Sequence, residues 1–446
     1  MRIIIIGGGE VGYHIAAVMS AENHIYVVDN SPERLSRIKD LDVQSILGNG
    51  SSPILLKEIL PADVLVAATN NDEVNIISCL NAKNLSENNI QTIARISNTD
   101  YVVSAVSSRT DLGVDVTVCP ELSLASEIIR LLNLQGAIDS ESFAEGRVEM
   151  IEFIISEENP YIGKKFKEVR FTDYCIISGI LRNNEMIIPG GDDFLSPGDH
   201  IIVLCSYADR DSVQKIFGSA KDTKKGNKKT DVVIFGCGTI GLYLAKVLDK
   251  DKTVDLKIIE KSNERCLEVV DMLPHSLILN GDATDINLFK EENLGSADVV
   301  IALTDSDEKN LLCGLTAKHM GAKKIISRTR RANYIPVFEM VGIDIALSTQ
   351  KTTVNEVLRL TAGKNVKKIH AISEGAEIFE FVAKGNTKFI GIPIKDFKFP
   401  KESIISMIVR NNNPIIPTGD TVIFPGDRVI VFAKVSAYDE VINLFK

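Results

Sequence analysis

The stretch IIIIGGGEVGYHIA, residues 3–16, contains the pattern that decides the fold. Four isoleucines predict a buried β-strand, and glycines in the spacing Gly-x-Gly-x-x-Gly follow where a helix is expected to begin. Gly7 permits the tight turn from strand to helix, Gly9 lets the backbone approach a pyrophosphate, and Gly12 lets the helix pack close to the sheet. Because the free N–H groups at the start of a helix attract phosphates, this arrangement predicts a nucleotide site on a Rossmann-type parallel sheet.

A carboxylate stands at the end of the next expected strand. Asp29 can accept hydrogen bonds from ribose hydroxyls there, and its charge repels a 2′-phosphate. The acid therefore favours NAD(H) over NADP(H), although Arg34 close by weakens the preference. ATP and ADP present the same ribose and phosphates, so the motif leaves them open as ligands.

The same pattern occurs a second time in VVIFGCGTIGLYLA, residues 232–245. Gly236, Gly238 and Gly241 repeat the glycine spacing, and Glu260 stands at the end of the following strand. One three-glycine match is a weak signal, but two matches, each after a strand and each with an acid, are a strong one. The alternative for either copy is that its glycines serve packing alone, without a ligand.

Two further segments repeat in the same order. VLVAATNNDEVN (64–75) matches VVIALTDSDEKN (299–310), and IIPGGDDFLSPGD (187–199) matches IIPTGDTVIFPGD (415–427). Apolar runs alternating with helical patterns are typical of a parallel sheet, whereas the later part of each half consists of short strands broken by Pro-Gly turns. We therefore predict an α/β protein with two Rossmann-type domains, each followed by a small α+β lobe. The predicted ranges are 1–135 and 230–362 for the Rossmann-type domains, and 140–220 and 366–446 for the lobes.

Composition excludes several function classes. A net charge of −10 argues against broad binding of nucleic acid or of anionic lipid. The Lys-rich stretch 221–229 is the exception, and its Gly, Ser, Thr and Asn neighbours predict a solvated linker between the halves. No apolar run approaches the roughly 20 residues that span a bilayer.

The reactive side chains predict neither a metal site nor catalysis. Seven cysteines form no CxxC pair, which fits a reducing cytoplasm. Cys237 lies in the second glycine turn, where a helix N-terminus would lower its pKa and allow redox sensing; the competing interpretation is a small residue that fills space. Because the six histidines match no catalytic pattern, we expect no enzyme activity. The alternative is an NAD-dependent oxidoreductase with the lobes as substrate domains.

Together these segments resemble the peripheral, NAD-binding subunit of Trk-type potassium uptake systems, the TrkA family, over essentially the whole chain. Proteins of this family contain tandem RCK domains, regulators of potassium conductance, each with a nucleotide-binding N-terminal domain and a C-terminal lobe. The resemblance is carried by both glycine segments, by the turn at 48–51, by GDATD at 281–285 and by the repeated lobe segments.

The resemblance implies a nucleotide site in each half. Asn49 and Asp282 would face the adenosine, and the alternative for both is a simple turn residue. Arg95 and Arg328 would lie near the phosphates, and the alternative for them is a surface salt bridge. The implied residues of the first half are Gly7, Gly8, Gly9, Glu10, Val11, Gly12, Asp29, Asn49, Gly50, Thr69, Asn70 and Arg95. Those of the second half are Gly236, Cys237, Gly238, Thr239, Ile240, Gly241, Glu260, Asp282, Ala283, Thr304, Asp305 and Arg328.

The resemblance also implies the biological setting. It implies a cytoplasmic regulatory subunit that binds NAD(H), or ATP or ADP, and gates a membrane potassium transporter. The subunit would form a homo-oligomeric RCK ring and lie at the inner face of the membrane through that transporter. The apolar helices expected at 119–135 and 348–362 would join adjacent RCK units or pack on their own sheets. A free-standing nucleotide sensor that acts on another protein remains a further alternative.

The two sites are expected to differ. Asn49 can donate and accept a hydrogen bond, whereas ionised Asp282 only accepts. The second site would then carry an extra carboxylate and disfavour more highly charged ligands. Glu260 also reaches further than Asp29, so the ribose should sit slightly differently in the second half.

Overall fold

The computed structural model folds into two compact units, and each unit takes residues from both halves of the sequence. The first consists of Met1–Ile128 and Lys228–Leu358, and the second of Ile129–Asn227 and Arg359–Lys446. The linker expected at 221–229 lies, apart from Lys229, outside the described residues. The structure describes the chain except for residues 21–22, 87–89, 99–100, 102–111, 133, 135, 170–174, 184, 219–228, 362–365, 373–374, 386, 388 and 446.

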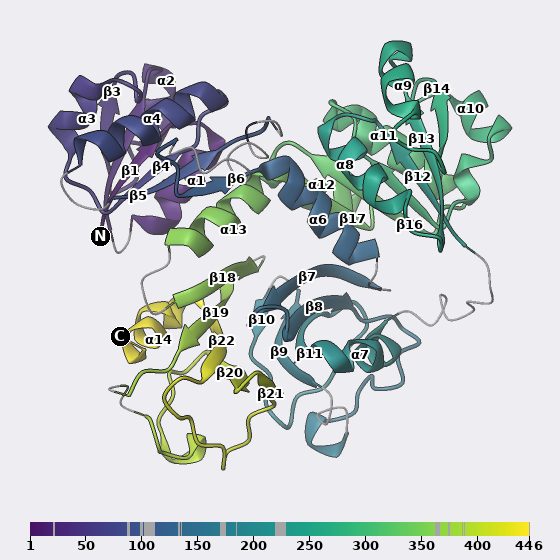
Figure 1. Ribbon diagram of the computed structural model, residues 1–446. Helices are drawn as coiled ribbons and strands as arrows, with labels where there is room; N and C mark the ends of the chain where they lie inside the picture. Colours follow the sequence, from purple (N-terminus) through teal and green to yellow (C-terminus); the bar gives the residue numbers. More distant parts are fainter. Residues whose placement is uncertain are drawn as a thin grey trace. The chain divides into compact units, whose positions relative to one another are not determined.

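The first unit contains two six-stranded parallel sheets of identical topology (Figure 1). The strand orders are β3-β2-β1-β4-β5-β6 and β14-β13-β12-β15-β16-β17. Each order reverses its direction beside the strand that carries the glycine turn, which is where open α/β sheets bind ligands. The strands of the first sheet are β1 Arg2–Ile6, β2 His24–Asp29, β3 Gln44–Leu47, β4 Val64–Ala67, β5 Gln91–Arg95 and β6 Val116–Val118. Those of the second are β12 Thr230–Phe235, β13 Val254–Glu260, β14 Leu277–Asn280, β15 Val299–Ala302, β16 Lys324–Thr329 and β17 Ile345–Ser348.

Successive residues of a strand point to opposite faces of the sheet, and the apolar strands here place apolar side chains on both faces. Helices cover both faces and bury these side chains. Ile4 and Ile6 pack with Leu56 and Cys79, whereas Ile5 lies beneath the first helix. In the first half the helices are α1 Glu10–Met19, α2 Pro32–Ile38, α3 Pro53–Ile59 and α4 Asp72–Leu85. In the second they are α8 Thr239–Leu248, α9 Asn263–Val270, α10 Ile286–Glu291, α11 Asp307–His319 and α12 Ile335–Met340. The predicted α/β fold with two Rossmann-type sheets is confirmed.

Two helices join the halves of the first unit. They are α6, Pro120–Leu132, and α13, Thr349–Thr361. The Ser123 hydroxyl donates to Glu356 at 2.5 Å, and the Thr352 hydroxyl donates to Glu127 at 3.0 Å. Ser123 and Glu127 hold the same positions in the first half as Thr352 and Glu356 in the second, so one contact is made twice by a local twofold relation. The two helices therefore contact each other across the halves, as the first of the two expected alternatives required.

The second unit contains two five-stranded antiparallel sheets, also of one topology, ordered β10-β9-β11-β8-β7 and β18-β19-β22-β20-β21. One apolar core draws on both lobes, including Phe143 and Ile202 from the first and Ile378 and Phe432 from the second. The first lobe contains β7 Ala137–Phe143, β8 Val148–Ile154, β9 Cys175–Arg182, β10 Glu185–Ile187, β11 His200–Ser206 and α7 Arg210–Phe217. The second contains β18 Val366–Ile372, β19 Ala376–Val382, β20 Ser403–Arg410, β21 Asn413–Ile415, β22 Arg428–Lys434 and α14 Tyr438–Leu444.

The repeated Pro-Gly-Asp segments of the lobes have a structural role. Gly198 and Gly426 adopt φ angles of +81° and +91°, which glycine favours. The aspartate after each glycine is buried and accepts hydrogen bonds from an arginine of a neighbouring strand. Arg182 Nη2 lies 2.7 Å from Asp199, and Arg410 Nη2 lies 2.8 Å from Asp427. Each segment thus forms a turn that a salt bridge between its aspartate and a strand arginine holds against the sheet.

Within the part of the chain that the structure describes, no helix has the length and apolar character needed to cross a membrane.

Candidate functional site

The three glycines of the first turn have three different structural reasons. Gly7 has a φ of +106°, which only glycine adopts readily. A Cβ on Gly12 would stand 1.8 Å from the Gly7 carbonyl oxygen, so α1 can cross the turn only with glycine there. Gly9 differs from both: its φ is −70°. No described atom beyond its chain neighbours lies within 4 Å of where its Cβ would stand. The protein leaves space beside Gly9 that a ligand can fill.

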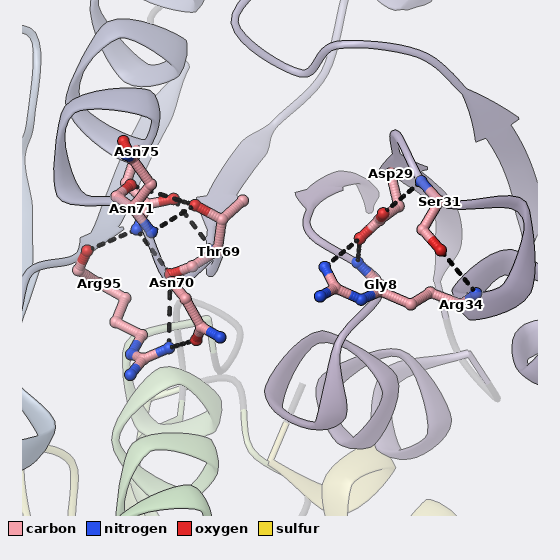
Figure 2. Close-up of polar contacts among 9 residues, drawn as sticks. All are labelled: Gly8, Asp29, Ser31, Arg34, Thr69, Asn70, Asn71, Asn75 and Arg95. Carbon is pink, nitrogen blue, oxygen red and sulfur yellow. Dashed lines mark hydrogen bonds and ion pairs between the residues drawn. The ribbon is translucent and has the colours of Figure 1, made fainter.

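Asp29 holds this turn in place. Its side chain is buried; Oδ2 accepts a hydrogen bond from the Gly8 N–H at 2.7 Å and Oδ1 accepts one from the Ser31 N–H at 2.8 Å. Arg34 Nη1 lies 3.5 Å from Oδ2, as Figure 2 shows. Asp29, the acid predicted to bind a ribose, therefore lies beside the glycine turn and forms an ion pair with Arg34.

Asn75 connects the ends of the two strands beyond the turn (Figure 2). Its Oδ1 accepts from the Thr69 N–H and hydroxyl at 3.0 and 2.7 Å, and its Nδ2 donates to the Arg95 carbonyl at 2.7 Å. Arg95 Nη1 in turn donates to Asn70 Oδ1 at 2.6 Å. Sequence reasoning missed Asn75, although its place in a repeated segment, matched by Asn310, was a usable signal.

A cavity of about 370 Å³ opens at this turn. Asn49 and Gly50 are not among the described residues that line it, and Asn49 instead accepts two hydrogen bonds from Ser51 in a local turn. The lining residues that were predicted for the first site are Gly7, Gly9, Glu10, Val11, Thr69, Asn70 and Arg95. Those not predicted as nucleotide-binding residues are Arg34, Arg37, Ala68, Pro120, Arg330, Thr349, Gln350 and Thr353. Arg328, predicted for the second site, also lines this cavity.

The cavity is rich in positive charge. Of its five arginines, Arg34 faces Asp29 and Arg37 lies 2.7 Å from Glu10. The other three, Arg95, Arg328 and Arg330, form no salt bridge within the described ranges. The buried Nε atoms of Arg95 and Arg328 also have no hydrogen-bond partner there. Guanidinium groups form strong charge-assisted hydrogen bonds with phosphates, so this wall fits an anionic ligand.

Burial affects the charge of one of these arginines directly. Loss of solvent around Arg328 lowers the pKa of its guanidinium, and the neighbouring Arg330 lowers it further. Arginine nevertheless stays protonated in proteins. Both effects therefore mean that the charged form of Arg328 is held in an unfavourable environment. An anion bound in the cavity would stabilise the positive charge of Arg328.

The second glycine turn repeats the backbone geometry of the first. Gly236 has a φ of +97°, and a Cβ on Gly241 would stand 2.1 Å from the Gly236 carbonyl oxygen. The space at Gly238 is open, as it is at Gly9. Glu260 takes the part of Asp29, since its Oε2 accepts from the Cys237 N–H at 2.8 Å. Thr239 and Ile240 form the first turn of the helix that follows.

The strand ends of the second half also repeat those of the first, with one difference. Asn310 Oδ1 accepts from the Thr304 N–H at 2.7 Å, and its Nδ2 donates to the Arg328 carbonyl at 3.0 Å. The Asp305 carbonyl accepts a hydrogen bond from Arg330 Nη2. The Arg95 side chain donates to Asn70 of its own half, and Arg328 lines the same cavity as Arg95, at the first turn.

The extra carboxylate expected at the second site, Asp282, is paired with two lysines. Asp282 Oδ1 accepts from the Thr284 hydroxyl and N–H, and Lys261 and Lys309 lie 3.0 and 3.9 Å from Oδ2. The Thr284 hydrogen bonds, followed by Lys261, lower the pKa of Asp282. Because two lysines face this single charge, they offset the repulsion that the Asp282 carboxylate was expected to exert on highly charged ligands. Ala283, beside it, is buried.

Cys237 is a buried packing residue. It has no exposed surface, and burial raises its pKa to about 11 despite the opposing charge of Arg265. The thiol is therefore protonated at neutral pH, which favours the space-filling interpretation over the redox one. All seven cysteines are free and buried. In the ranges that the structure describes, no group of three His, Cys, Asp or Glu side chains could hold a metal ion.

Comparison with solved structures supports this architecture. The RCK domain of GsuK has a TM-score of 0.60 at 17% identity, covering 100% of this chain and 94% of its own. The GsuK channel bound to NAD has a TM-score of 0.61 at 18% identity, covering 99% of this chain and 79% of its own. At such identities the likeness shows that the folds are the same.

Comparison with sequences identifies the family. The TrkA-N domain model matches residues 3–120 and 232–349, and the TrkA-C domain model matches 150–218 and 378–446. Trk system potassium uptake protein TrkA homolog 2 of Methanosarcina mazei is 48% identical over 100% of both chains. The TrkA homolog of Archaeoglobus fulgidus is 39% identical over 100% of both. TrkA of Haemophilus influenzae is 32% identical over 97% of this chain and 95% of its own. The chain therefore belongs to the TrkA family, with tandem TrkA-N and TrkA-C domains.

Proposed function

We propose that this chain is a regulatory subunit that binds NAD(H), or alternatively ATP or ADP, at its glycine turns and gates a potassium-uptake transporter. Its relatives carry the name Trk system potassium uptake protein. The GsuK channel, which shares its fold, has been solved bound to NAD. Nucleotide binding at both turns is the first step of the proposed mechanism.

The open space beside Gly9 carries the proposal. Alanine would fit at Gly9 without touching the protein, and a pyrophosphate approaching the turn would explain why a glycine stands there. The N-terminus of α1 points its free N–H groups into this space, and the arginine wall faces it. Asp29 lies beside the turn as an acceptor for ribose hydroxyls. Each of these features suits a different part of one nucleotide.

The cavity supports binding rather than chemistry. Of the described residues that line it, none is His, Lys, Cys or Tyr. Its one carboxylate, Glu10, is tied to Arg37. A hydride-transfer enzyme needs a proton donor or acceptor beside the reacting carbon, and arginine cannot serve because it does not lose its proton. We therefore propose that the ligand is bound and released unchanged.

The duplicated architecture supports the proposed assembly. The reciprocal contacts of α6 and α13 join two TrkA-N domains within one chain. A ring of such units then needs half as many chains as one built from single units. We propose a homo-oligomeric ring that attaches to the cytoplasmic face of a Trk-type potassium transporter, on whose gate the ligand-dependent shape of the ring acts. Co-purification of the chain with a membrane potassium transporter from native membranes tests this part.

Calorimetric titration with NAD⁺, NADH, ATP and ADP tests the binding step. We expect micromolar binding of at least one of them, about −8 kcal/mol. Gly9→Ala should abolish binding in the first half and Gly238→Ala in the second, with no loss of stability. Gly385→Ala is the matched control, because alanine also meets open space there, outside both turns. Absence of saturable heat with all four ligands would refute the proposal, and sustained NADH oxidation with a carbonyl substrate would favour an enzyme instead.

A further inference from the structure

Arg330 belongs to both glycine-turn regions at once. Its Nη2 donates to the carbonyl of Asp305, at the strand end of the second half, and the residue also lines the cavity at the first turn. Its backbone N–H is anchored to Asp307 Oδ1 at 2.8 Å, so the position of the residue is set by the second half. The side chain is exposed and can change rotamer without disturbing a packed core.

The first cavity offers Arg330 an alternative partner whenever an anion is present. Arg328 and Arg95 stand on the same wall, and neither is neutralised by a salt bridge within the described ranges. A hydrogen bond from guanidinium to phosphate is charge-assisted and stronger than one to a neutral carbonyl. An anionic group that reaches this wall therefore competes with the Asp305 carbonyl for the same guanidinium.

The arrangement occurs once in the chain and not twice. Asn75 donates to the Arg95 carbonyl and Asn310 to the Arg328 carbonyl, which sets residue 95 equivalent to residue 328. The position equivalent to Arg330 is then Ser97, which lacks a guanidinium. The two halves share the asparagine bridges but differ at this position.

We propose that Arg330 couples the two nucleotide sites of one chain, so that filling the first site weakens binding at the second. A ligand phosphate in the first cavity draws the guanidinium from the Asp305 carbonyl. The Thr304–Asp305 corner of the second site then loses a donor that holds it in place. Because coupling between sites is reciprocal, a ligand at the second site also weakens binding at the first. This inference rests on the proposed function, in which both turns bind nucleotides.

Calorimetry with ATP on the full-length protein tests the coupling, since its terminal phosphate adds charge beyond a pyrophosphate. Gly238→Ala leaves only the first site and Gly9→Ala only the second. We expect the product of the two wild-type dissociation constants to exceed the product of the two single-site constants about three- to tenfold, the value of one lost hydrogen bond. The same comparison in an Arg330→Ser background should give a ratio near one.

Arg331→Ser is the matched control, because Arg331 is adjacent and exposed but contacts Tyr334 and lies outside the cavity lining. It removes the same charge and should keep the full coupling. A ratio near one in the wild type, or an undiminished ratio in the Arg330→Ser background, overturns the inference and leaves nucleotide binding intact. So does binding of NADH without binding of ATP. Absence of binding by any nucleotide overturns the proposed function itself.

Discussion

The two glycine turns agree in backbone and differ in their charged surroundings. In both halves the first glycine of the motif takes a positive φ, the third touches the carbonyl of the first, and an acid accepts from the residue between the first two. The first turn faces arginines, two of which come from the second half, whereas the second turn is accompanied by Lys261 and Lys309 around Asp282. The two halves thus share the glycines that the backbone of the turn requires, but they differ in the charged side chains around it.

The sharpest way to separate the roles of the glycines is to replace them one at a time. Gly12→Ala and Gly241→Ala should each destabilise their domain by about 3 kcal/mol, because the new Cβ meets a backbone carbonyl oxygen that cannot move freely. Gly9→Ala should change stability by less than about 0.5 kcal/mol, since its Cβ enters open space. Urea unfolding monitored by circular dichroism measures all three. Equal, small losses at Gly12 and Gly9 would show that helix packing does not depend on Gly12.

The stabilities of the two lobes should depend differently on pH, because burial raises the pKa of a glutamate in each lobe. Burial raises the pKa of Glu377 to about 7, against the opposing effects of the Tyr438 hydrogen bond and of His370. An unfolded chain releases this proton near pH 4.5, whereas the folded lobe keeps it until about pH 7. The stability contributed is therefore full below pH 4.5, declines as pH rises to 7 and stays low above it.

Glu377→Gln should remove this decline, which we put at about 2 kcal/mol between pH 4.5 and 8 because the side chain is partly exposed. The measurement is the difference in unfolding free energy between variant and wild type at several pH values. Glu149 holds the equivalent place in the first lobe, where burial raises its pKa but Arg210 and Arg130 oppose the shift. Glu149→Gln should give a smaller slope; the reverse order would contradict the assignment of burial as the cause in Glu377.

Asp29 and Glu260, the acids at the two turns, should differ in how strongly they disfavour the 2′-phosphate of NADPH. Asp29→Ala and Glu260→Ala should each weaken NADH binding at their own site about tenfold, the value of a charge-assisted hydrogen bond. Asp29→Ala also releases Arg34, which lies 3.5 Å from that carboxylate, toward a 2′-phosphate. The ratio of NADPH to NADH affinity should therefore rise more in Asp29→Ala than in Glu260→Ala. Titration of each variant with both dinucleotides measures the ratio, and identical changes would show that the sites are equivalent.

The smallest effect is expected at the adenosine-side turns. Asp282→Asn leaves Lys261 and Lys309 without their shared acid, so affinity for ATP at the second site should rise, by less than about fivefold because the lysines are solvated. Asn49→Asp at the first site adds an acid and should lower affinity by a similar factor. Calorimetry in the single-site variants provides both values. A loss of affinity in Asp282→Asn would restore Asp282 as a direct ligand of the nucleotide.

Much of the backbone was predictable because its determinants are local. Glycine spacing, apolar strands and an acid at a strand end act within a few dozen residues, and the duplication in the sequence showed that they occur twice. Gly9, Gly12 and Asp29 accordingly lie beside one another as the pattern required. The asparagine bridges, Asn75 and Asn310, could also have been found, since they recur at the same place in the repeated segments.

By itself, the sequence determined the Rossmann-type sheets, their duplication and the family. Only tertiary structure decided which charges meet. Arg328 and Arg330 line the cavity of the first half, although more than 200 residues separate them from Gly9. Lys309, on α11, lies 3.9 Å from Asp282 Oδ2 in the turn after β14. The placement of Arg328 and Arg330 at the first turn depends on how α6 and α13 join the halves. No local periodicity encodes that join, because it arises from packing and electrostatics between surfaces far apart in the chain.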